Sequence, residues 1–257
     1  MDPEQIDDEE IVQLVDRAAL ITGGSSGIGL SIARVLGEEG YALTVSGRRP
    51  EKLDAAVAGL KEAGFDAEAV AANVVNEDEV IGLIDAHREQ RGRLDVLVNN
   101  AGVGIGGALG ETQTEHLDMQ MAINLRSYVI AIREALPMLQ EAGAEHGKAL
   151  IANTASIAGK MGQGWIGVYS ATKAGVIGLS EAAQKEFGKD GIQVTALCPG
   201  LVDTAMTGWA QKDVAAADMI RPEDIAESVR MLLRTSRNCV IPEIVFVRSG
   251  LEIPAPF

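Results

Sequence analysis

The chain has 257 residues, of which 47% are hydrophobic and 23% charged, a composition that buries a full core and excludes a disordered or fibrous protein. At about 150 residues per domain the length allows one or two domains, and a single α/β domain of this size is common. The balance of 22 Lys and Arg against 37 Asp and Glu gives a net charge of −15, which repels nucleic acid and anionic membrane surfaces. We therefore expect neither nucleic acid nor membrane as a partner.

The N-terminal residues 1–14 are rich in Asp and Glu and begin with MDPEQIDDEE. An export or transit signal would be basic, so this acidity indicates a cytoplasmic protein. The longest stretch without a charged residue, at 18–33, is broken by Gly and Ser and is shorter than the roughly 20 residues of a membrane span. The sequence predicts an acidic N-terminal arm over residues 1–14 and one domain over residues 15–257.

From Arg17 onward, short apolar or β-branched runs alternate with longer amphipathic stretches, which is typical of βαβ units. The runs predict seven strands, at residues 18–22, 42–47, 67–74, 94–99, 147–156, 192–199 and 243–248. Helices are expected near residues 27–39, 50–63, 77–90, 111–140, 168–187 and 222–233. The predicted fold is an α/β Rossmann fold, a doubly wound seven-stranded parallel sheet with helices on both faces and its ligand at the carboxyl ends of the strands.

Glycine and proline fall where the predicted elements join. Pro50 and Pro222 stand where proline opens a helix. Five glycines follow predicted helices, where a left-handed residue is expected: Gly40, Gly64, Gly92, Gly143 and Gly191.

The two cysteines, Cys198 and Cys239, have neither CxxC spacing nor neighbouring histidines. The sequence therefore predicts no metal site and no disulfide framework. We interpret both as small buried side chains.

A Gly-rich turn follows the first predicted strand, where residues 22–29 read TGGSSGIG and lead into a helix. Backbone N–H groups and the positive end of the helix dipole then face one point, which suits a pyrophosphate. The glycine spacing is G-x-x-x-G-x-G rather than the G-x-G-x-x-G of the dinucleotide fingerprint. A tight turn without a ligand is therefore the alternative.

The second predicted strand ends at Gly47 and is followed by Arg48 and Arg49. About 20 residues after the Gly-rich turn, an acidic residue would hold the ribose 2′-hydroxyl of NAD, and this chain has none there. Gly47 leaves space, and guanidinium groups suit a 2′-phosphate. The pair favours NADP(H), with NAD(H) possible and two solvated arginines as the alternative.

Tyr169 and Lys173 are four residues apart at the start of a predicted helix, which places the phenol and the ammonium on one face. A phenol is a poor acid at pH 7, and lowering its pKa by ~3 units takes ~4 kcal/mol. An ammonium at ~4 Å supplies about that much at an effective dielectric constant of ~20. Such pairs are also common on helix surfaces, so the pair alone is weak evidence.

Two further polar residues stand at informative positions. Ser156 ends the fifth predicted strand, where a hydroxyl points into the ligand crevice of this fold, although strand-end serines are usually turn residues. Asn124 lies inside a predicted helix, where its amide is neither a good helix former nor an obvious cap. A kink that the side chain satisfies is the alternative interpretation of Asn124.

In combination, these motifs resemble the short-chain dehydrogenase/reductase family in its shorter, single-domain branch. The resemblance covers about residues 15–250 and includes a spacing of 13 residues between Ser156 and Tyr169. The matching pieces are TGGSSGIG at 22–29, Asn73 and Val74 after the third strand, NNAG at 99–102, Asn124, Ser156, YSATK at 169–173 and CPGLVDT at 198–204.

The resemblance implies an NADP(H)-dependent oxidoreductase that interconverts a ketone or aldehyde and an alcohol by hydride transfer. Tyr169 would be the general acid or base, and Lys173 would lower its pKa and hold the nicotinamide ribose. Ser156 would hydrogen-bond the substrate oxygen, and Asn124 would hold a proton-relaying water through its backbone. An NAD(H)-dependent alcohol dehydrogenase and a catalytically silent dinucleotide sensor are the alternatives.

The resemblance also implies a cofactor site. Asn73 and Val74 would contact the adenine, Asn100 and Gly102 the adenosine-side ribose and backbone, and residues 199–204 the carboxamide. The implied cofactor-binding residues are Gly23, Ser25, Ser26, Gly27, Ile28, Gly29, Arg48, Arg49, Asn73, Val74, Asn100, Ala101, Gly102, Tyr169, Lys173, Pro199, Gly200, Val202 and Thr204.

The chain departs from the family pattern in two places. Cys198 stands where many members have Asn, and the chain ends in PEIVFVRSG at 242–250 instead of the frequent VDGG. We expect a homodimer through the helices at 111–140 and 168–187, or a homotetramer. Residues 103–110 and 206–220 would form the substrate mouth, and their only Lys or Arg is Lys212. A small or apolar ketone therefore fits better than a multiply charged substrate.

Overall fold

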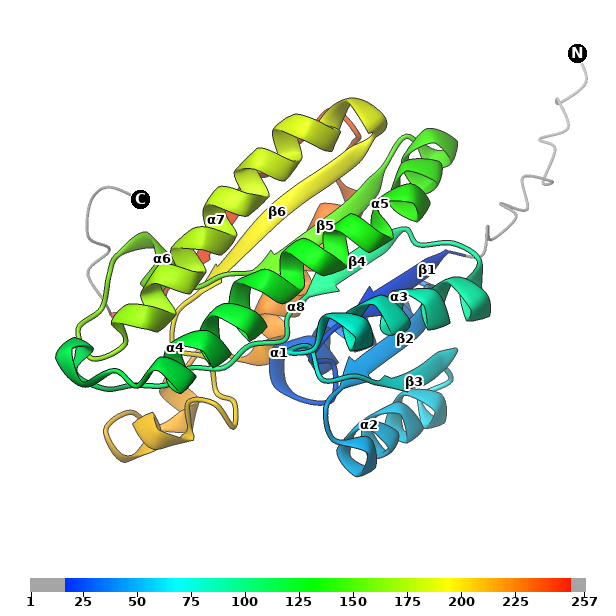
Figure 1. The fold of residues 1–257 in the computed structure, drawn as a ribbon. Helices are drawn as coiled ribbons and strands as arrows, with labels where there is room; N and C mark the ends of the chain where they lie inside the picture. The colour runs from blue at the N-terminus through cyan, green and yellow to red at the C-terminus, as the bar shows by residue number, and fades with distance from the viewer. Residues whose placement is uncertain (1–16, 251–257) are drawn as a thin grey trace, which may run out of the picture.

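The computed structural model describes residues 17–250. Seven strands of this region form one parallel sheet, and helices connect them (Figure 1). The predicted arm at 1–14 and the end of the predicted domain at 251–257 lie outside the described residues. The strands are β1 (Ala18–Ile21), β2 (Ala42–Gly47), β3 (Ala67–Ala71), β4 (Val96–Asn99), β5 (Ala149–Thr154), β6 (Ile192–Pro199) and β7 (Glu243–Phe246).

The strand order is β3-β2-β1-β4-β5-β6-β7, so the chain reverses its direction of travel across the sheet between β1 and β4. This reversal confirms the predicted doubly wound fold, and a crevice opens at such a switch point. The register pairs Ile21 of β1 with Val45 of β2 and with Val98 of β4. The carboxyl ends of the central strands therefore lie at one level.

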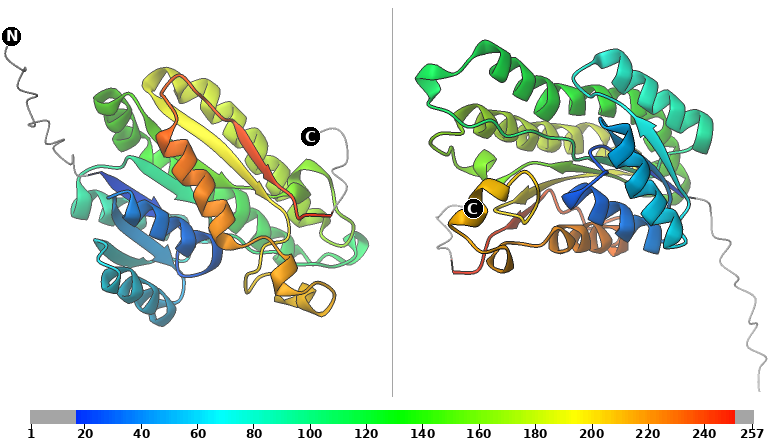
Figure 2. Two further views of the ribbon diagram at one scale, coloured as in Figure 1. Left: turned by 180° about the vertical axis from the view of Figure 1, so that it is seen from behind. Right: turned by 90° about the horizontal axis from the view of Figure 1, so that it is seen from below.

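Both faces of the sheet are covered by helices, as the view from below shows (Figure 2). In β1, Ala19 and Ile21 pack into the core beneath α1 (Gly27–Glu38), α2 (Pro50–Glu62) and α8 (Pro222–Arg234). The intervening Leu20 packs into the opposite core, beneath α3 (Glu77–Arg91), α5 (Ser127–His146) and α7 (Gly167–Phe187). Two buried faces explain why the strands are continuous apolar runs instead of alternating ones.

The helix predicted over residues 111–140 is divided in the structure. A 3₁₀ turn (Leu109–Glu111) and α4 (Thr114–Met121) come first, and a π-helical turn (Ala122–Arg126) joins α4 to α5. The short helix α6 (Ile157–Lys160) and the 3₁₀ turns Gly188–Asp190, Gly208–Lys212 and Ala216–Asp218 were not predicted.

Most of the punctuation predicted from Gly and Pro is confirmed. Pro50 and Pro222 open α2 and α8, and the glycines at 40, 64, 92 and 191 have positive φ. Gly143 is a correction, because it lies inside α5, which ends before Gly147 at φ +68°. A Cβ at Gly143 would lie 2.2 Å from the carbonyl oxygen of Asp190, so the glycine allows a close approach between segments.

The two cysteines differ in burial. Cys198 is buried in β6, whereas Cys239 is exposed, contrary to the prediction that both are buried. Within residues 17–250, no helix combines the length and apolarity needed to span a membrane.

Candidate active site

A cleft of about 320 Å³ lies at the carboxyl ends of the strands, between the Gly-rich turn after β1 and the first turn of α7. This volume is within the range of small-molecule sites, about 300–1,000 Å³. The residues predicted for catalysis and cofactor binding line the cleft, except Gly29 and Asn124. The structure therefore brings together side chains that the sequence spreads from Gly23 to Thr204.

The Gly-rich turn takes its shape from three glycines. Gly23 and Gly27 have φ values of +64° and +54°, in the left-handed region that favours glycine. Gly29 does not line the cleft. A Cβ there would lie 2.5 Å from the carbonyl oxygen of Gly23, so only glycine fits at this position. Gly29 thus allows α1 to start directly against the turn. The first N–H groups of α1 have no acceptor within the helix, and Gly27 and Ile28 line the cleft.

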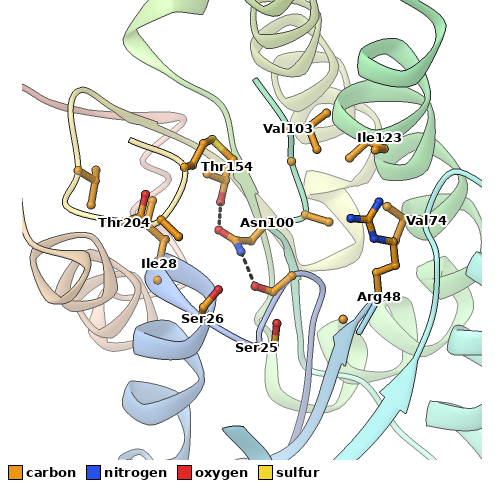
Figure 3. Close-up of a pocket in the computed structure, with 18 of the residues that line it drawn as sticks. Ser25, Ser26, Ile28, Arg48, Val74, Asn100, Val103, Ile123, Thr154 and Thr204 are labelled. Carbon is orange, nitrogen blue, oxygen red and sulfur yellow. Dashed lines mark hydrogen bonds between the residues drawn. The ribbon is translucent and has the colours of Figure 1, made fainter. Parts of the chain in front are cut away.

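Asn100 fastens this turn to the ends of β4 and β5 (Figure 3). Its side-chain Nδ2 donates to the carbonyl oxygens of Thr22 and Gly23, at 3.3 and 3.2 Å, and its Oδ1 accepts from the Thr154 hydroxyl at 3.2 Å. Its backbone N–H donates to the Thr22 hydroxyl at 3.0 Å. The side chain of Asn100 therefore positions the cleft wall.

The far end of the cleft, beyond β2, carries the arginine pair. Arg48 is exposed and lines the cleft together with Val74 (Figure 3), and Arg49 precedes α2. Within residues 17–250, no carboxylate lies within 4.0 Å of either guanidinium. Ser46, also in the cleft wall, has a buried hydroxyl with no hydrogen-bond partner among the described residues.

These features fit a dinucleotide that carries a 2′-phosphate. The helix N-terminus supplies N–H donors for a pyrophosphate, Arg48 supplies a cation at the expected distance along the chain, and the unpaired Ser46 hydroxyl can bond a polar ligand atom. A carboxylate that would repel a phosphate does not lie beside Arg48 within residues 17–250.

Ser156 and Tyr169 lie together at the other end of the cleft. Ser156 caps α6, because its Oγ accepts from the N–H of Ala158 at 3.1 Å, and it donates to the carbonyl oxygen of Pro199 at 3.3 Å. Tyr169 lies in the first turn of α7. Burial raises the pKa of the Tyr169 phenol above its usual value, whereas the nearby Ser156 hydroxyl lowers it.

Lys173 is buried one helical turn after Tyr169. Its Nζ donates to the carbonyl oxygen of Thr154 at 2.6 Å and lies 5.7 Å from the centre of the Tyr169 ring. Burial lowers the pKa of Lys173 to about 7. The sequence predicts that Lys173 lowers the pKa of Tyr169, whereas burial has the larger effect in the structure and raises it.

Asn124 lies in the π-helical turn and its side chain is fully buried. Its amide pairs with the backbone of Val103 in both directions, at 2.8 Å to the N–H and 2.9 Å to the carbonyl oxygen, and also donates to the Thr172 hydroxyl. The side chain thus fixes the loop that leaves β4. The water-holding role of its backbone stays a prediction.

Several residues that line the cleft were predicted neither as catalytic or cofactor-binding residues nor as part of the substrate mouth. They are Ser46, Gly47, Ala72, Ile123, Thr154, Ala155 and Ala205. The last three adjoin the motifs, so extending each motif by its neighbours would have found them, whereas Ser46 and Gly47 end β2, Ala72 follows β3 and Ile123 lies in the π-helical turn. Val103, Met206 and Thr207 also line the cleft and belong to the segments predicted as the substrate mouth. Within residues 17–250, no group of three or more His, Cys, Asp or Glu could hold a metal ion.

Comparisons with known proteins agree with this geometry. Residues 17–215 match the family model described as short chain dehydrogenase. The chain is 33% identical over 231 residues to an uncharacterized oxidoreductase of Staphylococcus aureus, which covers 90% of this chain and 96% of that protein.

Two solved structures are similar over almost the whole chain. A variant of actinorhodin polyketide ketoreductase with NADPH matches at a TM-score of 0.82 and 33% identity, covering 90% of this chain and 95% of that one. An alcohol dehydrogenase from the archaeon Thermococcus sibiricus, complexed with 5-hydroxy-NADP, matches at a TM-score of 0.83 and 29% identity, covering 93% and 99%.

Proposed function

The chain belongs to the short-chain dehydrogenase family of oxidoreductases, and from that premise we propose that it is an NADP(H)-dependent enzyme that interconverts a ketone or aldehyde and an alcohol. One observation carries the proposal: Ser156, Tyr169 and Lys173 line the same cleft as the Gly-rich turn. A proton donor, an oxygen-binding hydroxyl and a cation then face the place where a nicotinamide would lie.

The choice of NADP(H) is supported by Arg48. Its guanidinium stands in the cleft wall with no carboxylate beside it within residues 17–250, and such a group binds a 2′-phosphate well. The two similar structures contain NADPH and 5-hydroxy-NADP, which supports the same cofactor class for this chain.

The mechanism assigns each proton to an atom of this chain. Bound NADPH would supply the hydride for the carbonyl carbon. Tyr169 Oη donates its proton to the carbonyl oxygen, while Ser156 Oγ donates a hydrogen bond to that oxygen as negative charge develops on it. The phenolate left on Tyr169 would be stabilised by the Lys173 ammonium, whose Nζ lies 5.7 Å from the centre of the Tyr169 ring.

The cofactor choice is tested by calorimetric titration of the protein with NADPH and, separately, with NADH. We expect NADPH to bind at least about tenfold tighter, which is ~1.4 kcal/mol. Equal or tighter binding of NADH would overturn the assignment of Arg48 and favour the NAD(H)-dependent alternative.

The chemistry is tested by the variant Tyr169→Phe, assayed for NADPH-dependent reduction of ketones and aldehydes. We expect turnover to fall by about 10³-fold or more, because a positioned proton donor contributes roughly 10²–10⁴-fold, while NADPH affinity stays nearly intact. Tyr41→Phe is the matched control, since Tyr41 lies at the opposite end of β2 and bonds Arg17. Unchanged turnover in Tyr169→Phe would refute the mechanism.

The assembly and location follow from the sequence analysis alone. We propose a homodimer or homotetramer in the cytoplasm, and light scattering on the purified protein tests the assembly.

A further inference from the structure

A short strap, residues 103–107, crosses beside the catalytic tyrosine and is fastened at every second N–H group. Val103 donates to Asn124 Oδ1 at 2.8 Å, Ile105 to Gln120 Oε1 at 3.1 Å, and Gly107 to the carbonyl oxygen of Trp165 at 2.6 Å. The strap is therefore held by the π-helical turn, by α4 and by the loop that precedes α7.

The strap has glycines where it meets two aromatic rings. A Cβ at Gly104 would lie 3.7 Å from the Tyr169 ring, and a Cβ at Gly106 would lie only 2.2–2.5 Å from three atoms of the Trp165 indole. The indole therefore rests on the bare backbone of Gly106. Gly104 and Gly106 are two residues apart, so one short segment contacts both the phenol and the indole.

Trp165 is held there in an unfavourable backbone conformation. Its φ of +70° makes it the one non-glycine residue within residues 17–250 that has a positive φ. For a bulky residue this conformation costs roughly 1–3 kcal/mol, and such strain concentrates at functional sites. The side chain is nevertheless 63% exposed, so burial of the indole does not explain why the conformation is kept.

The surroundings of the opening are apolar. Residues 103–110, 161–168 and 204–211 contain no charged side chain, in a chain that is 23% charged. Met206 lines the cleft and is 47% exposed, and the chain's other tryptophan, Trp209, follows three residues later and is 62% exposed. Exposed large apolar side chains around a cleft mark a binding surface for an apolar group.

We propose that Trp165 is the aromatic wall of the substrate site and that the substrate is a ketone with an aryl group next to its carbonyl. This inference rests on the proposed function. The strap that contacts the Tyr169 ring also carries the indole, so an aryl group next to a carbonyl bound at Tyr169 Oη has an aromatic surface close by. The exposed part of the indole then packs against that ring, and its other part stays on Gly106.

Two variants displace or remove the indole by independent routes. Gly106→Ala introduces a Cβ into the space that the indole occupies, so the ring must move although it is still present. Trp165→Gly removes the ring and keeps the backbone, because glycine adopts positive φ without strain. Gly59→Ala in α2 is the matched control, since a Cβ there meets open space and the residue lies outside the cleft.

The probes are acetophenone and 2-butanone, each assayed with NADPH. We expect Gly106→Ala and Trp165→Gly to raise the KM for acetophenone relative to that for 2-butanone by roughly threefold to tenfold, the range of aromatic pair energies. Gly59→Ala should leave the ratio unchanged. A ratio that is equal in all four proteins would overturn the inference, while reduction of either ketone would still support the proposed function.

Fluorescence gives a readout that does not need turnover. In a Trp209→Phe background the emission comes from Trp165 alone, because the chain has two tryptophans. Titration of the NADPH-bound protein with 1-phenylethanol should change this emission in a saturable way, and Gly106→Ala should weaken the effect. No change with 1-phenylethanol would overturn the inference even if no ketone were reduced.

Discussion

The two ends of the cleft are built by different means. At the cofactor end, the Gly-rich turn lies where the pairing of β1 with β4 places it, and Thr22 and Asn100 bond it to the neighbouring strand ends. At the substrate end, the backbone of the strap is hydrogen-bonded to groups from other parts of the chain, such as the Asn124 side chain and the Trp165 carbonyl.

Because the two ends are held differently, we expect cofactor binding and substrate choice to respond to different substitutions. The cofactor end follows from strand register, so the fold supplies its geometry and a single added atom disrupts it. The substrate end depends on a few hydrogen bonds, each worth about 1 kcal/mol net. We therefore expect substitutions there to alter substrate turnover without altering cofactor binding, and three variants test that separation.

The largest effect is expected for Gly29→Ala, at the cofactor end. The new Cβ would lie 2.5 Å from both the carbonyl oxygen of Gly23 and the side chain of Asn100, so the turn must shift. Misplacement by about 1 Å costs roughly 10²-fold in rate, so we expect kcat/KM for NADPH to fall by about that much and calorimetry to show weaker NADPH binding. Gly82→Ala in α3, where a Cβ meets open space, should bind NADPH normally. If both variants bind alike, the turn is more tolerant than the register argument allows.

Arg48→Ala should lower the affinity for NADPH and leave the affinity for NADH unchanged. Hydrogen bonds to charged groups contribute about 1.5–3 kcal/mol, so NADPH affinity should fall by roughly 10- to 100-fold while NADH affinity stays the same. Separate titrations with each cofactor measure this, with Arg34→Ala on the exposed side of α1 as the control. An equal loss for NADPH and NADH would contradict a role in phosphate recognition.

Asn124→Ala should lower kcat/KM and leave NADPH affinity nearly unchanged. The substitution leaves the backbone N–H and carbonyl of Val103 without their partners, and we expect kcat/KM to fall roughly tenfold, for a loss of ~1.4 kcal/mol. NADPH affinity should change little, which calorimetry checks. Asn124→Asp keeps the acceptor for Val103 N–H and should recover part of the activity. A large loss of NADPH affinity would show that the two ends are coupled.

The smallest expected effect is a change in stability, and it concerns Lys173. Its pKa is about 7 in the folded protein and 10.5 as a free side chain, so the unfolded chain binds more protons between these pH values. Stability from this group therefore rises with pH from about 7 to 10.5 and carries its full penalty below about 7. Lys173→Met should be inactive but more stable, by about 2–4 °C in Tm per kcal/mol. The gain should be largest near pH 7 and vanish toward pH 10.5, and calorimetric melting at several pH values checks it. A gain that grows with pH would contradict the lowered pKa.

Much of the fold could be predicted from local sequence. The apolar runs located all seven strands, and Pro50 and Pro222 located two helix starts. Gly143 misled the prediction, because its glycine serves a contact with the distant Asp190 carbonyl instead of ending a helix. The π-helical turn was also missed, because it forms where Asn124 pairs with Val103, a partner in a separate loop.

The residues of the site also differ in whether local sequence could predict them. The cofactor residues sit in short motifs at strand ends, so their positions in the cleft could be predicted. The pairing of Trp165 with Gly106 joins two loops that are far apart in the chain, and no local pattern signals it. Only the place of Trp165, four residues before Tyr169, offered a hint.

The alternating attachment of the strap has a consequence for hydrogen exchange. The amide protons of Val103, Ile105 and Gly107 are bonded, whereas those of Gly104 and Gly106 have no acceptor within residues 17–250. Protected and unprotected amides should therefore alternate residue by residue along the strap in deuterium oxide. If the strap detaches as one unit, its three protected amides share a single opening free energy. The exchange rate of each amide, divided by its intrinsic rate, would then give the same opening constant, which is the fraction of time that the strap is detached.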